Sequence, residues 1–269
     1  MSAPVSSQLF SAVLRYWRKR RGHSQLDLAL EAGVSARHVS FLESGRARPS
    51  TAMAMRLLAT LQVPLRAQNE ALRAAGLSPA FPEPTLDALD PDIQRAIEQM
   101  MQQQEPYPLS VLGGDFHILR KNHGAKALLG AFIAEPSHMP ASPDMFTLFF
   151  DPRLVRPFVE DWDAFASSML NRLHRELLQR AYDQRLQDLL TRVLAFPDLP
   201  DTWREPDFAK PAPAAQTLRL RRDTLHVAFL VTVTKFSAPQ QVLLDELSIE
   251  SCFPLDDRTR ATCERLARP

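Results

Sequence analysis

The chain has 269 residues, of which 45% are hydrophobic and 23% are charged, and its formal net charge is +1. This length favours two domains that each bury a core, whereas two cysteines, Cys252 and Cys263, are too few for a disulfide framework and form no CxxC pair for zinc. No apolar run approaches the ~18 residues that a membrane span needs, and residues 1–11 lack the layout of a signal peptide, so we exclude membrane and secreted proteins and expect a cytoplasmic one.

The small net charge hides an asymmetry between the two ends of the chain. Residues 1–80 contain 11 Lys and Arg against 4 Asp and Glu, a net charge of +7, which leaves −6 for residues 81–269. A basic segment joined to an acidic one indicates a polyanionic partner for the basic segment. The alternative is ordinary solvated surface charge.

Residues 1–80 carry the signals of five short helices. Ser24 with Asp27 resembles a capping box, and Ser35 is expected to cap the third helix. Two short helices joined by a turn that contains glycine, here Gly33, form the helix-turn-helix unit. The expected helices run from Ser7 as cap to Arg21, from Ser24 to the Ala32-Gly33-Val34 turn, from Ala36 to Ser44, from Ser50 as cap to Gln62 and from Pro64 to Gly76.

A specific combination of residues accompanies these helices. It comprises Ser24-Gln25-x-x-Leu28-Ala29, Ala32-Gly33-Val34-Ser35, Val39-Ser40, Leu42-Glu43-x-Gly45 and Pro49-Ser50. This combination resembles the Xre family of phage-repressor-like helix-turn-helix domains across residues 8–76. The resemblance implies an all-α, five-helix DNA-binding domain, which we place at residues 1–80, and a partly buried ion pair between Arg18 and Glu43.

The third helix is the expected DNA-reading element. Val39 and Leu42 are expected to bury one of its faces, which leaves the opposite face for the major groove. Arg37 is the candidate for bidentate contact with guanine, and Phe41 is expected either to touch a thymine methyl group or to pack against the fourth helix. Gln25 is expected to bind a phosphate at the start of the second helix. The candidate DNA-binding residues are Gln25, Ser35, Ala36, Arg37, His38, Ser40, Phe41, Arg46 and Arg48, with Arg46 and Arg48 assigned to phosphates.

A single domain of this size contacts only one half-site. Repressor-like proteins therefore usually dimerise and read a near-palindrome with half-sites about one helical turn apart. We expect a homodimer on double-stranded DNA.

A linker and connecting helix are predicted over residues 81–105. Prolines interrupt any helix between residues 76 and 90, and Asp90 is expected to cap a helix over residues 91–104. Its apolar stripe consists of Ile93, Ile97 and Met100. The stripe is expected to dock on the second domain or, alternatively, to pair with its twin across a dimer axis.

The remaining residues, 106–269, mix strand and helix patterns. A strand hairpin is expected over residues 109–120, and Asn122 is expected to cap a helix. Further helices are expected over residues 162–175 and 182–196, and strands over residues 217–222, 225–235 and 242–252. These elements predict an α+β domain with an antiparallel sheet.

A second set of residues recurs in order through this domain. It comprises Pro106-Tyr107-Pro108, Asn122, Ala125, Leu128-Leu129, Phe150-Asp151-Pro152-x-x-x-Arg156-Pro157, Asp161-Trp162, Phe236, Pro239-Gln240-x-Val242-x-Leu244-x-Glu246-Leu247-x-Ile249-Glu250 and Phe253-Pro254. The set resembles the ligand-binding domain of MmyB-like transcription regulators, a PAS-like fold found C-terminal to Xre-type domains. The resemblance implies long apolar ligands, fatty acids among them.

Apolar side chains and two arginines are the candidates for such a ligand site. The candidate ligand-binding residues are Phe116, Phe132, Phe146, Phe149, Arg156, Trp162, Phe165, Arg172, Leu173 and Phe229. Arg156 or Arg172 would meet an acyl carboxylate. The alternative for each apolar residue taken singly is a packed core.

No catalytic motif of the GxSxG, P-loop, HExxH or GxGxxG kind stands in the chain. Haem or flavin held through His123, His138 or His174 is conceivable for a PAS-like domain, as is a thiol switch through Cys252 and Cys263, but no motif supports either. We expect no enzyme, no metal and no cofactor other than a bound apolar ligand.

These features predict a bacterial one-component transcription regulator whose second domain senses a small apolar ligand. The alternative retains the DNA-binding domain and makes the second domain a ligand-free oligomerisation or protein-docking module.

Overall fold

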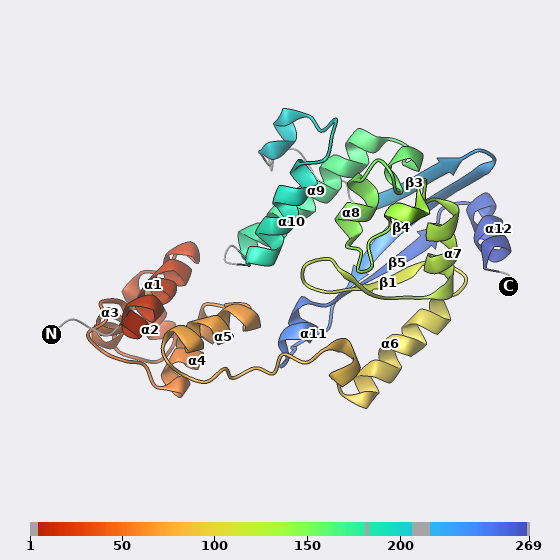
Figure 1. Cartoon of the computed structure of the whole chain (residues 1–269). Helices are drawn as coiled ribbons and strands as arrows, with labels where there is room; N and C mark the ends of the chain where they lie inside the picture. The colour runs from red at the N-terminus through yellow and green to blue at the C-terminus, as the bar shows by residue number, and fades with distance from the viewer. Residues whose placement is uncertain (1–4, 181–182, 206–215, 268–269) are drawn as a thin grey trace. The chain divides into compact units, whose positions relative to one another are not determined.

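The computed structural model describes residues 5–180, 183–205 and 216–267. The chain divides into two compact units, which we treat separately (Figure 1). The first comprises residues 1–83 and 238–245, and the second comprises residues 84–237 and 246–269. The short segment 238–245 therefore belongs to the first unit, although the strands on either side of it belong to the second.

Five helices make up most of the first unit: α1 (Val5–Arg20), α2 (Gln25–Glu31), α3 (Ala36–Glu43), α4 (Thr51–Thr60) and α5 (Leu65–Ala74). The side chains of Ser24, Ser35 and Ser50 accept hydrogen bonds from backbone N–H groups at the starts of α2, α3 and α4, which confirms these caps. The chain is already helical at Val5, so the prediction that Ser7 caps α1 is wrong. Gly33 turns the chain between α2 and α3 at a φ of +63°, which costs glycine little.

The helices of the first unit enclose one apolar core. Trp17 of α1 is its largest member, and Phe10 and Leu14 lie beside it on the same helix face. Val39 and Leu42 of α3 are fully buried in this core, as predicted. Burial of that face fixes which side of α3 is left for a partner.

A buried amide holds the start of the linker against α5. The Asn69 amide nitrogen donates to the carbonyl of Phe81 (2.8 Å) and to Glu83 Oε1 (2.9 Å), and its oxygen accepts from the N–H groups of Ala80 and Phe81 (both 3.0 Å). All four hydrogen-bonding positions of this amide are filled. Residues 80–83 are thereby fastened to the first unit.

The segment 238–245 contains most of a short helix, α11 (Val242–Glu246), which β5 (Ser248–Pro254) follows. The prediction of one strand over residues 242–252 is therefore wrong in its first half. Val242 is fully buried, and its N–H donates to the carbonyl of Pro82 (3.0 Å). Tertiary contacts of this kind override the strand-like pattern of apolar residues.

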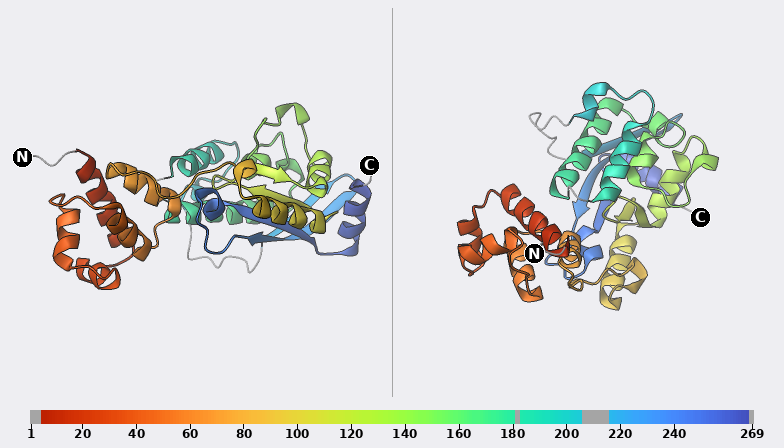
Figure 2. Two further views of the ribbon diagram at one scale, coloured as in Figure 1. Left: turned by 90° about the horizontal axis from the view of Figure 1, so that it is seen from below. Right: turned by 60° about the vertical axis from the view of Figure 1, so that its left-hand side comes forward.

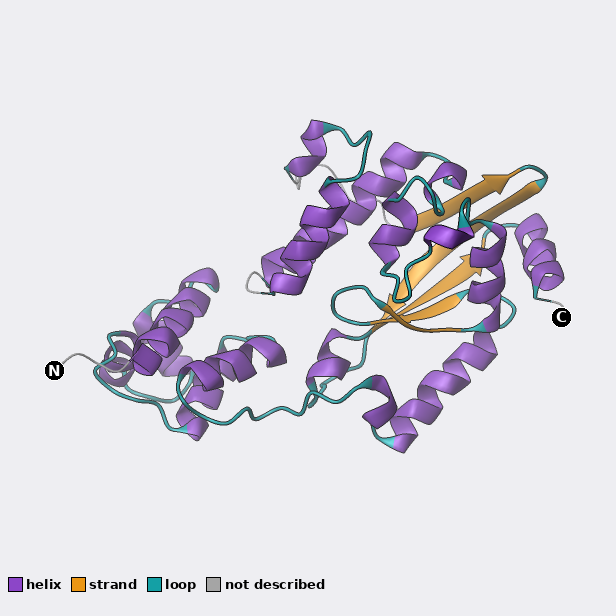
Figure 3. Ribbon diagram, in the orientation of Figure 1, coloured by secondary structure: helices purple, strands orange, loops and turns teal. Residues whose placement is uncertain are grey.

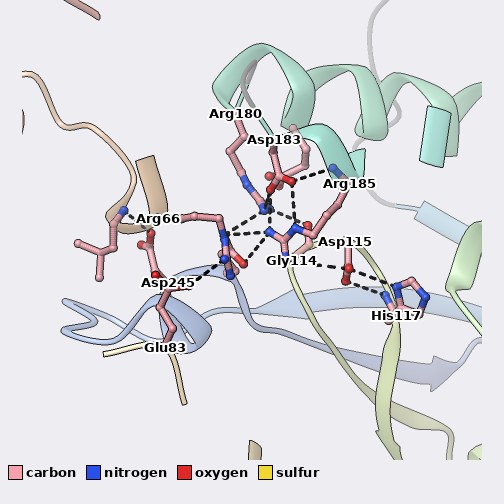
Figure 4. Close-up of polar contacts among 12 residues, drawn as sticks. Arg66, Glu83, Gly114, Asp115, His117, Arg180, Asp183, Arg185 and Asp245 are labelled. Carbon is pink, nitrogen blue, oxygen red and sulfur yellow. Dashed lines mark hydrogen bonds and ion pairs between the residues drawn. The ribbon is translucent and has the colours of Figure 1, made fainter. Parts of the chain in front are cut away.

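α5 receives its N-terminal cap from a residue 180 positions away in the sequence. Its own N-cap residue is Pro64, which makes no side-chain cap hydrogen bond. Asp245 of α11 supplies one, because its Oδ2 accepts a hydrogen bond from the N–H of Leu65 at 3.0 Å (Figure 4). The carboxylate also places negative charge at the positive end of the helix dipole.

We expect Asp245→Ala to lower the free energy of unfolding of α5 by about 1 kcal/mol, the usual loss when an N-cap side chain is removed. Hydrogen exchange of peptides from α5, in the full-length protein, measures this loss. Gln240→Ala is the matched control, because Gln240 is exposed in the same segment. Unchanged exchange in α5 of the Asp245 variant would show that this carboxylate adds no stability.

The second unit is built on a five-stranded sheet with the strand order β2-β1-β5-β4-β3. Figure 3 shows its strands in orange, with helices beside them. The other strands of the sheet are β1 (Leu109–Leu112), β2 (Ile118–Lys121), β3 (Gln216–Arg222) and β4 (Leu225–Thr234). Every neighbouring pair is antiparallel, and β1 lies between β2 and β5. The early hairpin and the last strands therefore join in one sheet, which confirms the predicted α+β class.

The helices of the second unit are α6 (Pro91–Gln104), α7 (His123–Ala131), α8 (Met145–Phe150), α9 (Trp162–Gln179), α10 (Gln184–Leu194) and α12 (Asp257–Leu266), with 3-10 turns at Leu86–Ala88, Pro136–His138, Arg156–Phe158 and Asp201–Arg204. Asp90 and Asn122 cap α6 and α7 as predicted. Tyr182, the predicted start of α10, lies outside the described residues. α12 is absent from the predicted elements.

α9 and α10 pack against each other beside the sheet (Figures 1 and 2). Together with α7 and α8 they enclose the apolar core of the second unit. α6 packs on β1 instead, where Ile97 is 1% exposed and the Gln104 amide donates to the carbonyl of Cys252 (2.9 Å). The apolar stripe of α6 therefore docks on the second domain, which is the first of the two arrangements predicted for it. None of the helices in the described ranges is long and apolar enough to span a bilayer.

Candidate DNA-binding surface and ligand-binding core

α3 presents its second face away from the core. Arg37 is exposed there, one turn before Phe41 on the same face. The half-buried candidates on this helix are Ala36, His38, Ser40 and Phe41. Ala36 packs against the core, and the hydroxyl of Ser35 accepts from the N–H of His38 (3.1 Å) as the cap. Arg37 and Phe41 are therefore the long side chains that this face offers to a partner.

Two groups of arginines in the first unit differ in whether their guanidinium groups have partners within the protein. Those of α1 and its C-terminal end are engaged within the protein: Arg15 donates to the carbonyl of Glu43, Arg18 to the carboxylate of Glu43, Arg20 to the hydroxyl of Tyr16 and Arg21, directly after α1, to the carbonyl of Leu61. Arg37, Arg46 and Arg48 are exposed, and their guanidinium groups make no hydrogen bond or ion pair with any described residue. The second group is therefore available for phosphates and base edges.

The basic loop after α3 is tied back to the end of that helix. The N–H groups of Arg46 and Ala47 both donate to the carbonyl of Phe41 (2.9 and 3.2 Å). Gly45 makes this return possible at a φ of +72°, in the left-handed region that favours glycine. The loop that carries Arg46 and Arg48 is thereby anchored to the helix that carries Arg37.

A buried carboxylate joins α1, α2 and α3. Glu43 is 3% exposed and accepts from Arg18 Nε (2.6 Å), Arg18 Nη2 (3.0 Å) and Gln25 Nε2 (2.7 Å). This confirms the predicted pair, and the hydrogen bond to Glu43 raises the pKa of Arg18. The Gln25 amide nitrogen thus has a protein partner, and its predicted phosphate contact stays a prediction.

The apolar candidates for a ligand site gather in the core of the second unit. Those that are buried there are Phe116, Phe132, Phe146, Phe149, Phe165, Leu173 and Phe229, and Trp162 packs against them. The ring centroids of Phe116 and Phe146 are 4.9 Å apart, as are those of Phe149 and Phe165. Such edge and tilted contacts are typical of a packed core.

Both arginines assigned to an acyl carboxylate have protein partners. Arg172 forms an ion pair with Glu250, and its Cζ lies 5.0 Å from the centroid of the Phe116 ring. Arg156 donates to the carbonyl of Pro197 (2.8 Å), and its Cζ lies 4.7 Å from the Trp162 centroid. A ligand carboxylate at Arg172 would have to compete with Glu250.

A surface pocket of about 140 Å³ lies where α9 begins beside β3. It is lined by Glu160, Asp161, Ala164, Phe165, Ser168, Gln216, Thr217 and Arg219, of which Phe165 alone is a predicted ligand residue. No local sequence signal marks the others, because the bridge between Val159 and Leu220 brings them together. The volume is below the ~300–1,000 Å³ of drug-sized ligand sites, so this pocket suits a small polar group rather than a long acyl chain.

A cluster of charges joins the end of α9 and the start of α10 to the end of α11 (Figure 4). Its two acids, Asp183 and Glu246, are buried, whereas the Arg185 side chain is 39% exposed. Arg185 donates to Asp183 (3.0 Å) and lies 3.2 Å from Glu246, while Arg180 pairs with both acids. Burial by itself would raise the pKa of Asp183, but the hydrogen bonds and charges of Arg185 and Arg180 outweigh it and lower that pKa. The four charges satisfy one another, so the cluster holds the elements in place.

The residues of the redox and cofactor alternatives lie apart from any recognisable site. Burial raises the pKa of Cys263 to about 11 and also raises that of Cys252, which makes the reactive thiolates scarce at neutral pH. His123 and His138 are exposed, whereas His174 is buried and burial lowers its pKa. Within the described ranges, no group of three or more His, Cys, Asp and Glu side chains is placed to hold a metal ion.

Comparison with protein families finds two matches. Residues 14–68 match the helix-turn-helix family, and residues 93–266 match the family described as MmyB-like transcription regulator ligand binding domain. Comparison with curated proteins finds no match. The two matched domains point to a transcription regulator, which is not an enzyme. Since the second match covers more than half of the chain, the protein belongs to the MmyB-like transcription regulators, with a helix-turn-helix DNA-binding domain ahead of its ligand-binding domain.

Proposed function

We propose that the protein is a homodimeric one-component regulator that binds a near-palindromic operator through α3 and the basic loop after it. A small apolar ligand in the second domain, such as a fatty acid, binds one arrangement of the dimer better than another. The ligand thereby changes operator affinity by linkage, for which coupling of roughly 5- to 150-fold is typical.

The observation that carries this proposal is that the guanidinium groups of Arg37, Arg46 and Arg48 make no hydrogen bond or ion pair with the residues that the structure describes. These arginines lie on α3 and on the loop anchored to its end, while the arginines of α1, and Arg21 directly after it, are engaged within the protein. A helix N-terminus that enters the major groove places its first residues against base edges. Arg37, the second residue of α3, has that position, and the loop arginines suit phosphates.

The passage of the chain between the units at the end of α11 supports a coupling between them. Asp245 belongs to the first unit, where it caps α5, and the next residue, Glu246, belongs to the second, where it pairs with Arg180 and Arg185. β5 starts two residues after Glu246. A ligand that displaces β5 or the charged cluster would therefore act on the cap of α5.

The ring-to-ring packing of the second core favours the alternative of a ligand-free docking or oligomerisation module. In that case the second domain would only assemble the dimer. The two functions differ in whether a molecule leaves the core when the domain unfolds.

Selection from random-sequence DNA, followed by mass spectrometry, tests the proposal. Selection should enrich two related half-sites about one helical turn apart, and enrichment of no motif would overturn the operator. A native mass spectrum should show a dimer that loses a discrete acyl-sized mass on denaturation. Equal native and denatured subunit masses would instead support the ligand-free module, and a monomer would overturn the dimer.

A further inference from the structure

Two side chains on the exposed face of α3, Arg37 and Phe41, form a cation–π pair. The Cζ atom of Arg37 lies 5.1 Å from the centroid of the Phe41 ring. Phe41 is half-buried but does not belong to the apolar core of the first unit, as far as that core is described. An arginine whose face rests on a ring keeps its planar set of N–H donors free at the edge. Phe41 is therefore a neighbour of Arg37 rather than a core residue.

Phe41 is well placed to act as a fixed support. Its carbonyl accepts hydrogen bonds from the N–H groups of Arg46 (2.9 Å) and Ala47 (3.2 Å) and from the hydroxyl of Ser44 (3.3 Å). These bonds anchor the backbone that carries the ring at the end of α3. A long side chain held in one place by a ring loses less conformational freedom when it binds a partner.

The cation–π pair can serve two neighbouring base pairs when the guanidinium lies parallel to the ring. For an arginine to donate to both O6 and N7 of guanine, its guanidinium must lie in the plane of that base. A ring stacked on the guanidinium then lies level with the next base pair and turns its edge toward the groove wall. Thymine presents its C5 methyl group there, which offers an apolar contact.

We propose that Arg37 and Phe41 act as one reading unit for a guanine and a thymine in adjacent base pairs of the operator. Arg37 bonds to the guanine. Phe41 contacts the thymine methyl group and holds the guanidinium in the plane of the guanine, so it is also a positioning residue. This inference rests on the proposed function, in which α3 enters the major groove.

Base analogues in the selected operator test the inference in the full-length protein. Replacing the guanine by 7-deazaguanine removes one of the two acceptors, and the wild type should lose part of the roughly 5- to 150-fold discrimination that a full bidentate contact supplies. Replacing the thymine by uracil removes only a methyl group, and the expected loss of operator affinity is about 4-fold. Both losses should appear at adjacent base pairs.

Variants then separate the two roles of Phe41. Phe41→Ala should abolish the uracil effect and reduce the 7-deazaguanine effect, because the guanidinium is no longer held in the plane. Phe41→Leu retains an apolar contact without a ring face, so it should retain a uracil effect and still reduce the 7-deazaguanine effect. Arg48→Ala, the matched control in the loop, should weaken binding to all probes alike and leave both effects unchanged.

The outcomes distinguish this inference from the proposed function. If selection enriches no motif, sequence-specific binding itself fails, and the inference fails with it. If a motif is enriched but the wild type is insensitive to the two analogues at adjacent base pairs, operator binding stands and the reading unit is wrong. An unchanged 7-deazaguanine effect in both Phe41 variants would also overturn the positioning role.

Discussion

Replacing Glu43 with alanine should lower the free energy of unfolding of the helix-turn-helix domain by about 3–5 kcal/mol, the cost of leaving a buried charge without its partner. Arg18 and Gln25 both donate to this carboxylate, and the Arg18 side chain is only 11% exposed, so water cannot easily replace the lost acceptor. Since whole domains are stable by only ~5–15 kcal/mol, DNA binding should weaken as well. Hydrogen exchange of α1 and α3 in the full-length protein measures the loss without assuming that both domains unfold together.

Glu31→Ala is the matched control for this prediction. The Glu31 side chain is 55% exposed and lies 3.1 Å from the ring of His23, so it belongs to a surface pair in the same domain. Such pairs contribute ~0–1 kcal/mol, and exchange should hardly change. A Glu43→Ala effect as small as the Glu31→Ala effect would mean that the buried pair does not hold the three helices together.

Gly124→Ala should destabilise α7 and its contact with the start of β1 by about 1–3 kcal/mol, the range for an overpacked site. A β-carbon at this position would lie 2.2 Å from the carbonyl oxygen of Pro106 and 2.8 Å from its carbonyl carbon. Both are backbone atoms, so no side chain can rotate away to make room. If α7 shifts to relieve the clash, the Gly124 N–H also loses its hydrogen bond to Glu105 (2.9 Å). Hydrogen exchange of α7 is the measurement.

Gly130→Ala, in the same helix, should stabilise α7 instead of destabilising it. A β-carbon there meets no atom within 4 Å, and alanine restricts the unfolded chain more than glycine does, which stabilises a helix by ~0.4–1 kcal/mol. Slower exchange in α7 for this variant and faster exchange for Gly124→Ala is the expected pair of results. Stabilisation by both would show that α7 does not approach Pro106 as closely as the structure places it.

Local patterns predicted much of the secondary structure. Ser24, Ser35 and Asn122 cap the helices that follow them, because a cap depends on a residue and its next three neighbours only. The Arg18–Glu43 pair came from the family resemblance rather than from spacing, since its members are 25 residues apart. The predicted caps hold because each depends on a short local motif. The predicted ion pair holds because it depends on the order in which several motifs follow one another along the chain.

Two helices near the C-terminus, α11 and α12, are missing from the predicted elements for different reasons. Asp256 accepts from the N–H of Thr259 (2.7 Å) and caps α12, so a local capping signal is present in the sequence for this helix, which the predicted elements lack. Residues 242–246 begin the apolar stretch for which a strand is predicted, yet they form α11 because Val242 is buried against the linker and Asp245 caps α5. No window of neighbouring residues contains that information.

The sequence by itself determined the family and the two-domain order and predicted which helix reads DNA, because motifs and periodicity are local features of the sequence. The tertiary structure alone decided which arginines stay free for DNA and that the aromatic candidates pack on one another. Whether a guanidinium group is available depends on whether the fold brings a distant acceptor beside it. Arg21 donates to the carbonyl of Leu61, 40 residues further along the chain, whereas the Arg37 guanidinium has no acceptor in the described part of the chain. Hydrogen bonds between residues so far apart in the sequence depend on the whole fold, which no local pattern encodes.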